Sequence, residues 1–176
     1  MTNETQLRLW RHDDAGVRHH LPLLSARGIK QTLQLLSAPL HKRTVEGTLV
    51  ALGTAPAKYA SKITCSDTAP MALDAAWYGC PLLVDCVVNL TAPVPDGDGS
   101  SEILLGRTPV PGSVFLQDGA TLTPLAIDGQ KVTVARVRTG AFVTYRPRLN
   151  MMLKSFALES AEWEVKQGWT IDLEEI

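Results

Sequence analysis

The chain has 176 residues, enough for one domain that buries roughly 70% of its extended surface and too few for two full domains. With 45% hydrophobic and 20% charged residues, the composition is that of a globular protein and excludes a disordered chain. A net charge of −1 gives no general attraction to nucleic acid or to anionic lipid, so we expect neither as a partner.

The sequence also lacks the signals that direct a chain to a membrane. No window of about 18 apolar residues is present, so no membrane span is expected. The first residues, MTNETQLRLWRHDD, lack the basic flank and apolar core of a secretory signal. We therefore expect synthesis in a reducing cytoplasm, with Cys65, Cys80 and Cys86 as free thiols.

The first third of the chain predicts short strands. Apolar and polar residues alternate in residues 5–11 and again in residues 29–36, where a short helix is the alternative. Residues 43–52 are rich in β-forming residues and predict one strand, in which Gly47 indicates a bulge or a close backbone approach. Residues 58–62 are compatible with one helical turn, and a short strand is expected at residues 63–66.

The middle of the chain combines one short helix with further strands. Residues 71–77 are the best candidate for a helix, and residues 82–90 predict a central strand buried on both faces. Asp85 is the one acid in that apolar run and therefore needs a partner. Residues 93–101 predict a loop, and the Asp-Gly pairs at 118–119 and 128–129 predict two tight hairpins in a meander over residues 102–146.

The last segment, residues 141–176, carries the longest unbroken alternation of the chain and is expected to organise the fold. Two runs joined near residues 159–161 predict a terminal β-hairpin. Its dry face holds Trp163, Trp169, Ile171 and Leu173 on the second run. The sequence thus predicts a single, mainly β domain over residues 1–176, an antiparallel sandwich or barrel with at most one or two short helices.

Candidate metal sites do not match known ligand spacings. The cluster of His12, Asp13, Asp14, His19 and His20 has no zinc-site spacing, and the three cysteines match no iron–sulfur pattern. The calcium-like run at residues 96–100 has Ser101 and Arg107 where glycine and glutamate are required. No catalytic motif is present either, so we expect no metal, no cofactor and no enzyme activity.

Arg146 and Arg148 flank Pro147 just before the terminal hairpin. A guanidinium binds carboxylates through two parallel hydrogen bonds, which suits both interfaces and internal ion pairs. Two hypotheses stay open: a pair within the fold, to acids such as Asp85 or Glu174, and a contact between subunits.

Two blocks resemble a known family. The first is ITCSDTAPMALDAAWYGCPLLVDCVVNL at residues 63–90, preceded by RTVEGTLVAL at residues 43–52, and the second is residues 145–176, with the pattern YRPRL…EW…GW…DLEE. Together they resemble small tail-tip or baseplate proteins, similar to distal tail proteins, of long-tailed bacteriophages and related prophages.

The resemblance implies a structural protein of the virion tail. Such a protein has a β-sandwich or tube-like fold and forms a ring that joins the tail tube to the hub and receptor-binding parts, near the tape measure protein. Residues 93–140 would then be an inserted meander that decorates the domain. For contacts between copies we expect Arg146 and Arg148 to face acids of a neighbour, namely Asp172, Glu174 and Glu175.

The alternative is a free-standing β-sandwich module that binds carbohydrate through Trp10, Trp77 or Tyr78. Side-chain exposure separates the two hypotheses. A carbohydrate-binding module needs an aromatic platform that faces solvent, whereas a ring protein is expected to bury Trp163 and Trp169.

Overall fold

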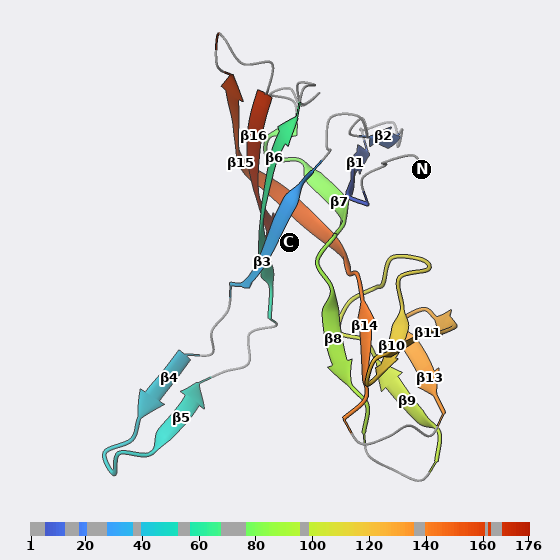
Figure 1. The fold of residues 1–176 in the computed structure, drawn as a ribbon. Helices are drawn as coiled ribbons and strands as arrows, with labels where there is room; N and C mark the ends of the chain where they lie inside the picture. The colour runs from blue at the N-terminus through green and yellow to red at the C-terminus, as the bar shows by residue number, and fades with distance from the viewer. Residues whose placement is uncertain are drawn as a thin grey trace.

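The computed structural model describes residues 6–12, 18–20, 28–36, 40–52, 57–67, 77–95, 99–135, 140–160, 162 and 167–176. Nearly all of these residues lie in antiparallel strands or in the turns between them, and no α-helix lies among them. The predicted mainly β fold is therefore confirmed (Figure 1). The helix predicted at residues 71–77 lies outside the described residues, apart from Trp77.

The largest sheet has seven strands, and the terminal hairpin lies inside it. The strand order is β2-β1-β7-β15-β16-β6-β3, so β15 and β16 are flanked on both sides. All neighbours are antiparallel. The strands are β1 (Arg8–His12), β2 (Arg18–His20), β3 (Lys30–Leu35), β6 (Tyr59–Asp67), β7 (Pro81–Asp85), β15 (Arg148–Ser160) and β16 (Gln167–Glu175).

One face of this sheet forms the main core. Trp169, Ile171 and Leu173 of β16 are 1–2% exposed, as the predicted alternation requires; Trp163 lies outside the described residues. A register shift between Leu153 and Ser155 interrupts the alternation in β15. Such a bulge reverses the faces on which the following side chains lie. The core residues of this sheet are Leu7, Leu9, Ile63, Cys65, Trp77, Leu82, Val84, Cys86, Leu149, Met151, Leu153, Trp169, Ile171 and Leu173.

Beyond the bulge, Phe156 is half-buried and Ala157 is exposed. Two predictions in this region are wrong. Residues 58–62 are not a helical turn, because β6 begins at Tyr59 and pairs with both β3 and β16, and these two ladders decide the conformation. The run at residues 82–90 is two strands instead of one, since β7 ends at Asp85 and the chain then leaves the sheet.

The chain between β7 and β15 forms a second unit with its own core. One sheet has the order β11-β10-β14-β8 and another the order β12-β13-β9. Both predicted tight hairpins are confirmed, but their turns lie one residue later than the Asp-Gly pairs, at residues 119–120 and 129–130, with φ of 61° at Gly119 and 60° at Gly129. The strands are β8 (Leu90–Pro93), β9 (Ser101–Leu104), β10 (Phe115–Asp118), β11 (Thr121–Pro124), β12 (Ile127–Asp128), β13 (Lys131–Val134) and β14 (Phe142–Tyr145).

This inserted unit is defined here as residues 86–147. Its own core consists of Val94, Ile103, Leu105, Val114, Val132, Val134, Ala141, Val143 and Tyr145, while Cys86 at the start of the unit is buried in the core of the seven-stranded sheet. Residues 93–140, predicted as an inserted meander, lie within it. Figure 1 shows the unit beyond the end of β7, where that strand and β15 leave the large sheet.

A two-stranded hairpin projects from the other side of the molecule. It pairs β4 (Leu40–Arg43) with β5 (Leu49–Leu52) and follows β3 in the chain. Figure 1 shows it extending away from the end of the large sheet. The single strand predicted for residues 43–52 is therefore wrong, because Gly47 has a φ of 84° and allows the chain to reverse.

Candidate interaction surfaces

Arg148 forms an ion pair inside the subunit. Its Nε and Nη2 donate to the two carboxylate oxygens of Asp85 at 2.6 and 2.9 Å, across the paired strands β15 and β7. The Asp85 side chain is only 4% exposed. The hydrogen bond to Asp85 raises the pKa of Arg148, which stays charged. Of the two hypotheses for Arg148, the structure shows the pair within the fold, and Asp85 has the partner that its burial requires.

Arg146 has different surroundings from Arg148, although only Pro147 separates the two. Its Nη1 donates to the backbone oxygen of Gln6 at 3.2 Å, and its backbone N–H donates to Ser113 Oγ at 3.2 Å. The side chain is half-buried in a groove of about 330 Å³, defined here as the Arg146 groove. The described residues that line it are Gln6, Asn89, Gly112, Ser113, Phe115, Leu122, Thr144 and Arg146, and none of these carries a carboxylate.

The three acids predicted to face a neighbouring copy all have partners within the subunit. Asp172 accepts a hydrogen bond from Ser155 Oγ at 2.7 Å. Glu174 lies 2.7 Å from the Lys154 ammonium, an exposed pair of little energetic weight. Glu175 binds Arg107 and Tyr59. The structure brings neither Arg146 nor Arg148 to these acids within one subunit, so their pairing between copies stays a prediction.

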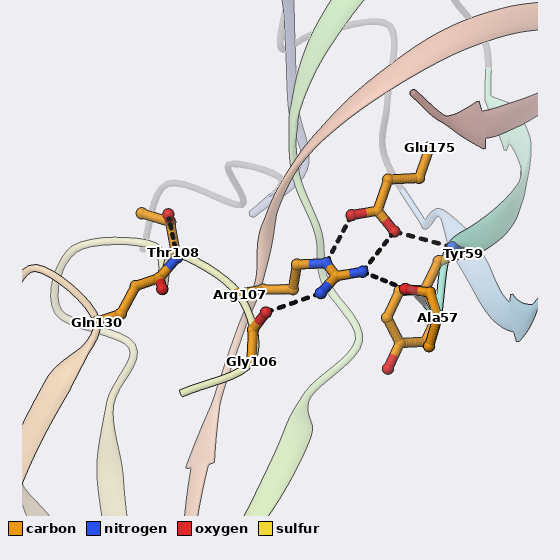
Figure 2. A network of polar contacts seen from close by, with 7 residues as sticks. All are labelled: Ala57, Tyr59, Gly106, Arg107, Thr108, Gln130 and Glu175. Atoms are coloured by element: carbon orange, nitrogen blue, oxygen red, sulfur yellow. Dashed lines mark hydrogen bonds and ion pairs between the residues drawn. The ribbon is translucent and has the colours of Figure 1, made fainter. Parts of the chain in front are cut away.

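Arg107 joins the inserted unit to the large sheet, as Figure 2 shows. Its Nε donates to Glu175 Oε1 at 2.5 Å and its Nη2 to Glu175 Oε2 at 3.0 Å. Nη2 also donates to the backbone oxygen of Ala57, and the guanidinium lies 5.5 Å from the centre of the Tyr59 ring. The hydrogen bond to Glu175 raises the pKa of Arg107. This network fixes the β9–β10 connection against the start of β6.

The tip of the β4–β5 hairpin is ordered by its own hydrogen bonds. Gly47 N–H donates to the Thr44 oxygen at 2.9 Å, and Thr48 N–H donates to Thr44 Oγ1 at 3.1 Å. Arg43 closes the turn by donating from Nη1 to the Gly47 oxygen at 2.9 Å. This arrangement places Val45, which is 107% exposed, and the exposed Glu46 at the outermost point.

The tryptophans of the described residues do not form a platform. Trp10 is 4% exposed, Trp77 is 7% and Trp169 is 1%. Arg148 lies over the Trp10 ring at 5.1 Å and Arg11 over Trp77 at 5.3 Å, so arginines cover both. Of the three aromatic residues proposed for carbohydrate, Tyr78 alone is exposed. This burial disfavours the carbohydrate-binding alternative.

The thiols of the described chain are poorly placed for nucleophilic chemistry. Cys65 and Cys86 are buried and Cys80 is half-buried, all three as free thiols. Burial raises the pKa of Cys86 to about 12, so its thiolate is scarce at neutral pH. Within the described ranges no group of three His, Cys, Asp or Glu side chains could hold a metal ion. The same ranges contain no helix that is both long and apolar enough to cross a membrane.

Comparison of the chain with protein-family models, with curated proteins and with solved structures gives no match. The similarity of residues 63–90 and 145–176 to phage tail-tip proteins therefore stays a prediction from sequence. The projecting hairpin, the Arg146 groove and the free edges of the sheets are the features from which a function can be inferred.

Proposed function

We propose that this chain is a structural subunit of a bacteriophage tail that joins copies of itself and neighbouring tail proteins through β-strand surfaces. The observation that carries the proposal is the projecting β4–β5 hairpin. All its described side chains, those of residues 42–50, are exposed, and among the described strands each of its two strands pairs only with the other.

The composition of the hairpin points to a covered state. Val45, Leu49 and Val50 are exposed by 107%, 56% and 40%. Burying one such side chain fully contributes roughly 1.5–3 kcal/mol, and an isolated two-stranded hairpin is marginally stable in water. A protein surface that covers the arm would therefore stabilise both the arm and the assembly.

The edges of the sheets give a second surface for assembly. Among the described strands, β3 is the longest edge strand, with six residues and no proline. Other edges are shorter, and β8 and β11 each end in a proline. Proteins usually protect their edges, and an unprotected edge pairs readily with another chain. The edge of β3 is thus suited to a neighbouring subunit.

The tail is the biological setting that the sequence supports. The resemblance of residues 145–176 to distal tail proteins implies a ring around the tail axis, with the tube, the hub and the tape measure protein as neighbours. Contacts made by an arm of one copy on a different surface of the next generate closed rings when the rotation closes. This role needs no cofactor and no reaction.

Deleting the arm tests the proposal. In the variant, residues 41–51 are replaced by a short glycine-serine turn, and the oligomeric state is measured by analytical ultracentrifugation. We expect the parent chain to form multimers and the variant to stay a monomer with the same circular dichroism. Ile127→Ser, which removes an exposed apolar side chain elsewhere, is the control and should assemble like the parent.

Two results would contradict the proposal. A parent chain that stays monomeric up to millimolar concentration has no need of an arm, and a deletion variant that assembles like the parent does not use it. Whether the protein belongs to a phage tail is tested by mass spectrometry of purified phage particles from cells that encode the chain. If the protein is absent from every particle, the proposed place in a tail is wrong.

A further inference from the structure

We infer that the tip of the β4–β5 hairpin of one copy docks in the Arg146 groove of the next copy. The Glu46 carboxylate would accept hydrogen bonds from the Arg146 guanidinium, and Val45 would lie against Phe115 and Leu122. This inference rests on the proposed function, because it names the surface that receives the arm.

Glu46 at the tip and Arg146 in the groove carry opposite charges. Among the described residues Arg146 is the one charged residue that lines the groove, and its guanidinium makes a single hydrogen bond to them, to the Gln6 oxygen. A guanidinium carries five N–H donors, so most of them have no partner in the described part of the chain. Glu46 is exposed and takes part in no salt bridge with another described residue. A carboxylate is the group that the planar fork of arginine binds best.

The apolar parts of the two surfaces match as well. Leu122 at one side of the groove is 58% exposed, and Phe115 beside it is half-buried. Val45 precedes Glu46 in the turn and has no side-chain neighbour to shield it, at 107% exposure. A groove of about 330 Å³ lies at the lower end of the volumes of ligand sites, which suits one or two side chains better than a large ligand.

The tip meets the groove of another copy and not its own. Figure 1 shows β4 and β5 on one side of the molecule, and β10 and β11, which contribute Phe115 and Leu122, on the other. The contact therefore joins two different surfaces of successive copies, the head-to-tail arrangement that produces rings or filaments.

The turn at the tip of the hairpin is also preorganised for binding. The hydrogen bonds of Thr44, Gly47 and Thr48 fix the turn before any contact is made. Little conformational freedom is then lost on docking, which favours affinity. The inference gives Arg146 a different partner from Asp172, Glu174 and Glu175, which are already engaged within the subunit.

Charge reversal tests the pairing. Glu46→Arg and Arg146→Glu are each expected to raise the dissociation constant for self-association on the order of a hundredfold, since like charges then face each other. The double variant with both changes restores an attractive pair and should recover most of the affinity. Glu102→Arg and Lys131→Glu change exposed charges by the same amounts away from the groove and serve as controls. All variants are checked by circular dichroism and measured by analytical ultracentrifugation.

Mixing the two single variants tests whether the contact joins separate copies. In an equimolar mixture the Glu46→Arg copy offers an intact groove and the Arg146→Glu copy offers an intact tip. The two reversed residues also match each other. Assembly should therefore return on mixing, with the two variants alternating, although neither assembles alone.

Three outcomes would overturn the inference. Single variants that assemble like the parent show that Glu46 and Arg146 do not pair. The proposed function is then tested by the arm-deletion variant alone. Singles that fail without recovery in the double variant or in the mixture show that the two residues do not meet. Multimers in the arm-deletion variant remove the proposed function and this inference together.

Discussion

The two hairpins of this chain, β15–β16 and β4–β5, have the same local construction and opposite surroundings. Both are antiparallel ladders of two strands. The first is flanked by β7 and β6 and buries Leu153, Trp169 and Leu173. The second has no flanking strand among the described residues and buries none of its described side chains. Flanking strands and a covered face decide whether a hairpin supports the fold or serves as an arm.

The largest effect is expected in the central hairpin. Trp169→Ala removes the indole from the main core and should lower the free energy of unfolding by about 3–5 kcal/mol, as other large-to-small core changes do. Urea unfolding followed by circular dichroism measures the change. Val45→Ala in the arm is the matched control and should leave the urea midpoint of the isolated subunit unchanged. Equal midpoints for Trp169→Ala and the parent would show that the comparison is wrong.

A smaller effect is expected where the central hairpin meets β7. Arg148→Met leaves the buried Asp85 carboxylate without its partner and should cost about 2–3 kcal/mol of unfolding free energy, because Arg148 is partly exposed at 29%. The double variant with Asp85→Leu removes both charges and should recover most of that loss. A double variant that is less stable than Arg148→Met would show that the pair itself stabilises the fold.

The smallest effect on stability, and a clear effect on assembly, is expected in the arm. Leu49 is 56% exposed, so Leu49→Ser should change the unfolding free energy of the isolated subunit by no more than about 0.5 kcal/mol and its melting temperature only slightly. Differential scanning calorimetry at low concentration measures this. The same variant should associate more weakly in analytical ultracentrifugation. A large loss of stability in the monomer would mean that the arm packs on its own subunit.

Local signals in the sequence predicted much of the fold. Asp-Gly pairs determine tight turns by themselves, and an alternation with tryptophan on one parity requires a covered face, so the hairpins at Gly119 and Gly129 and the central hairpin were predictable. The errors at residues 43–52 and 58–62 arise where distant strands or one glycine torsion decide the conformation. No local pattern distinguishes a bulged strand from a turn around Gly47.

The interaction surfaces were less predictable. Asp85 in an apolar run signals a buried partner, and Arg148 was one of two candidates for it. Arg107 and Glu175 are separated by 68 positions, and neither lies in a sequence pattern that indicates an ion pair. The Arg146 groove draws residues from five separate places in the chain, so its existence depends on tertiary structure alone. The sequence identified Arg146 itself, and its predicted pairing with acids of another copy stays a prediction.

The way in which the inserted unit leaves and rejoins the large sheet has a consequence for how such chains can vary. Asp85 and Arg148 face each other in the ladder, and the Cys86 N–H donates to the Pro147 oxygen at 3.0 Å, so the unit begins and ends on neighbouring strands. A two-residue turn would span the same gap. Because both ends of the unit lie on this one ladder, changes in the length of its outer loops leave the register of the strands beneath unaltered.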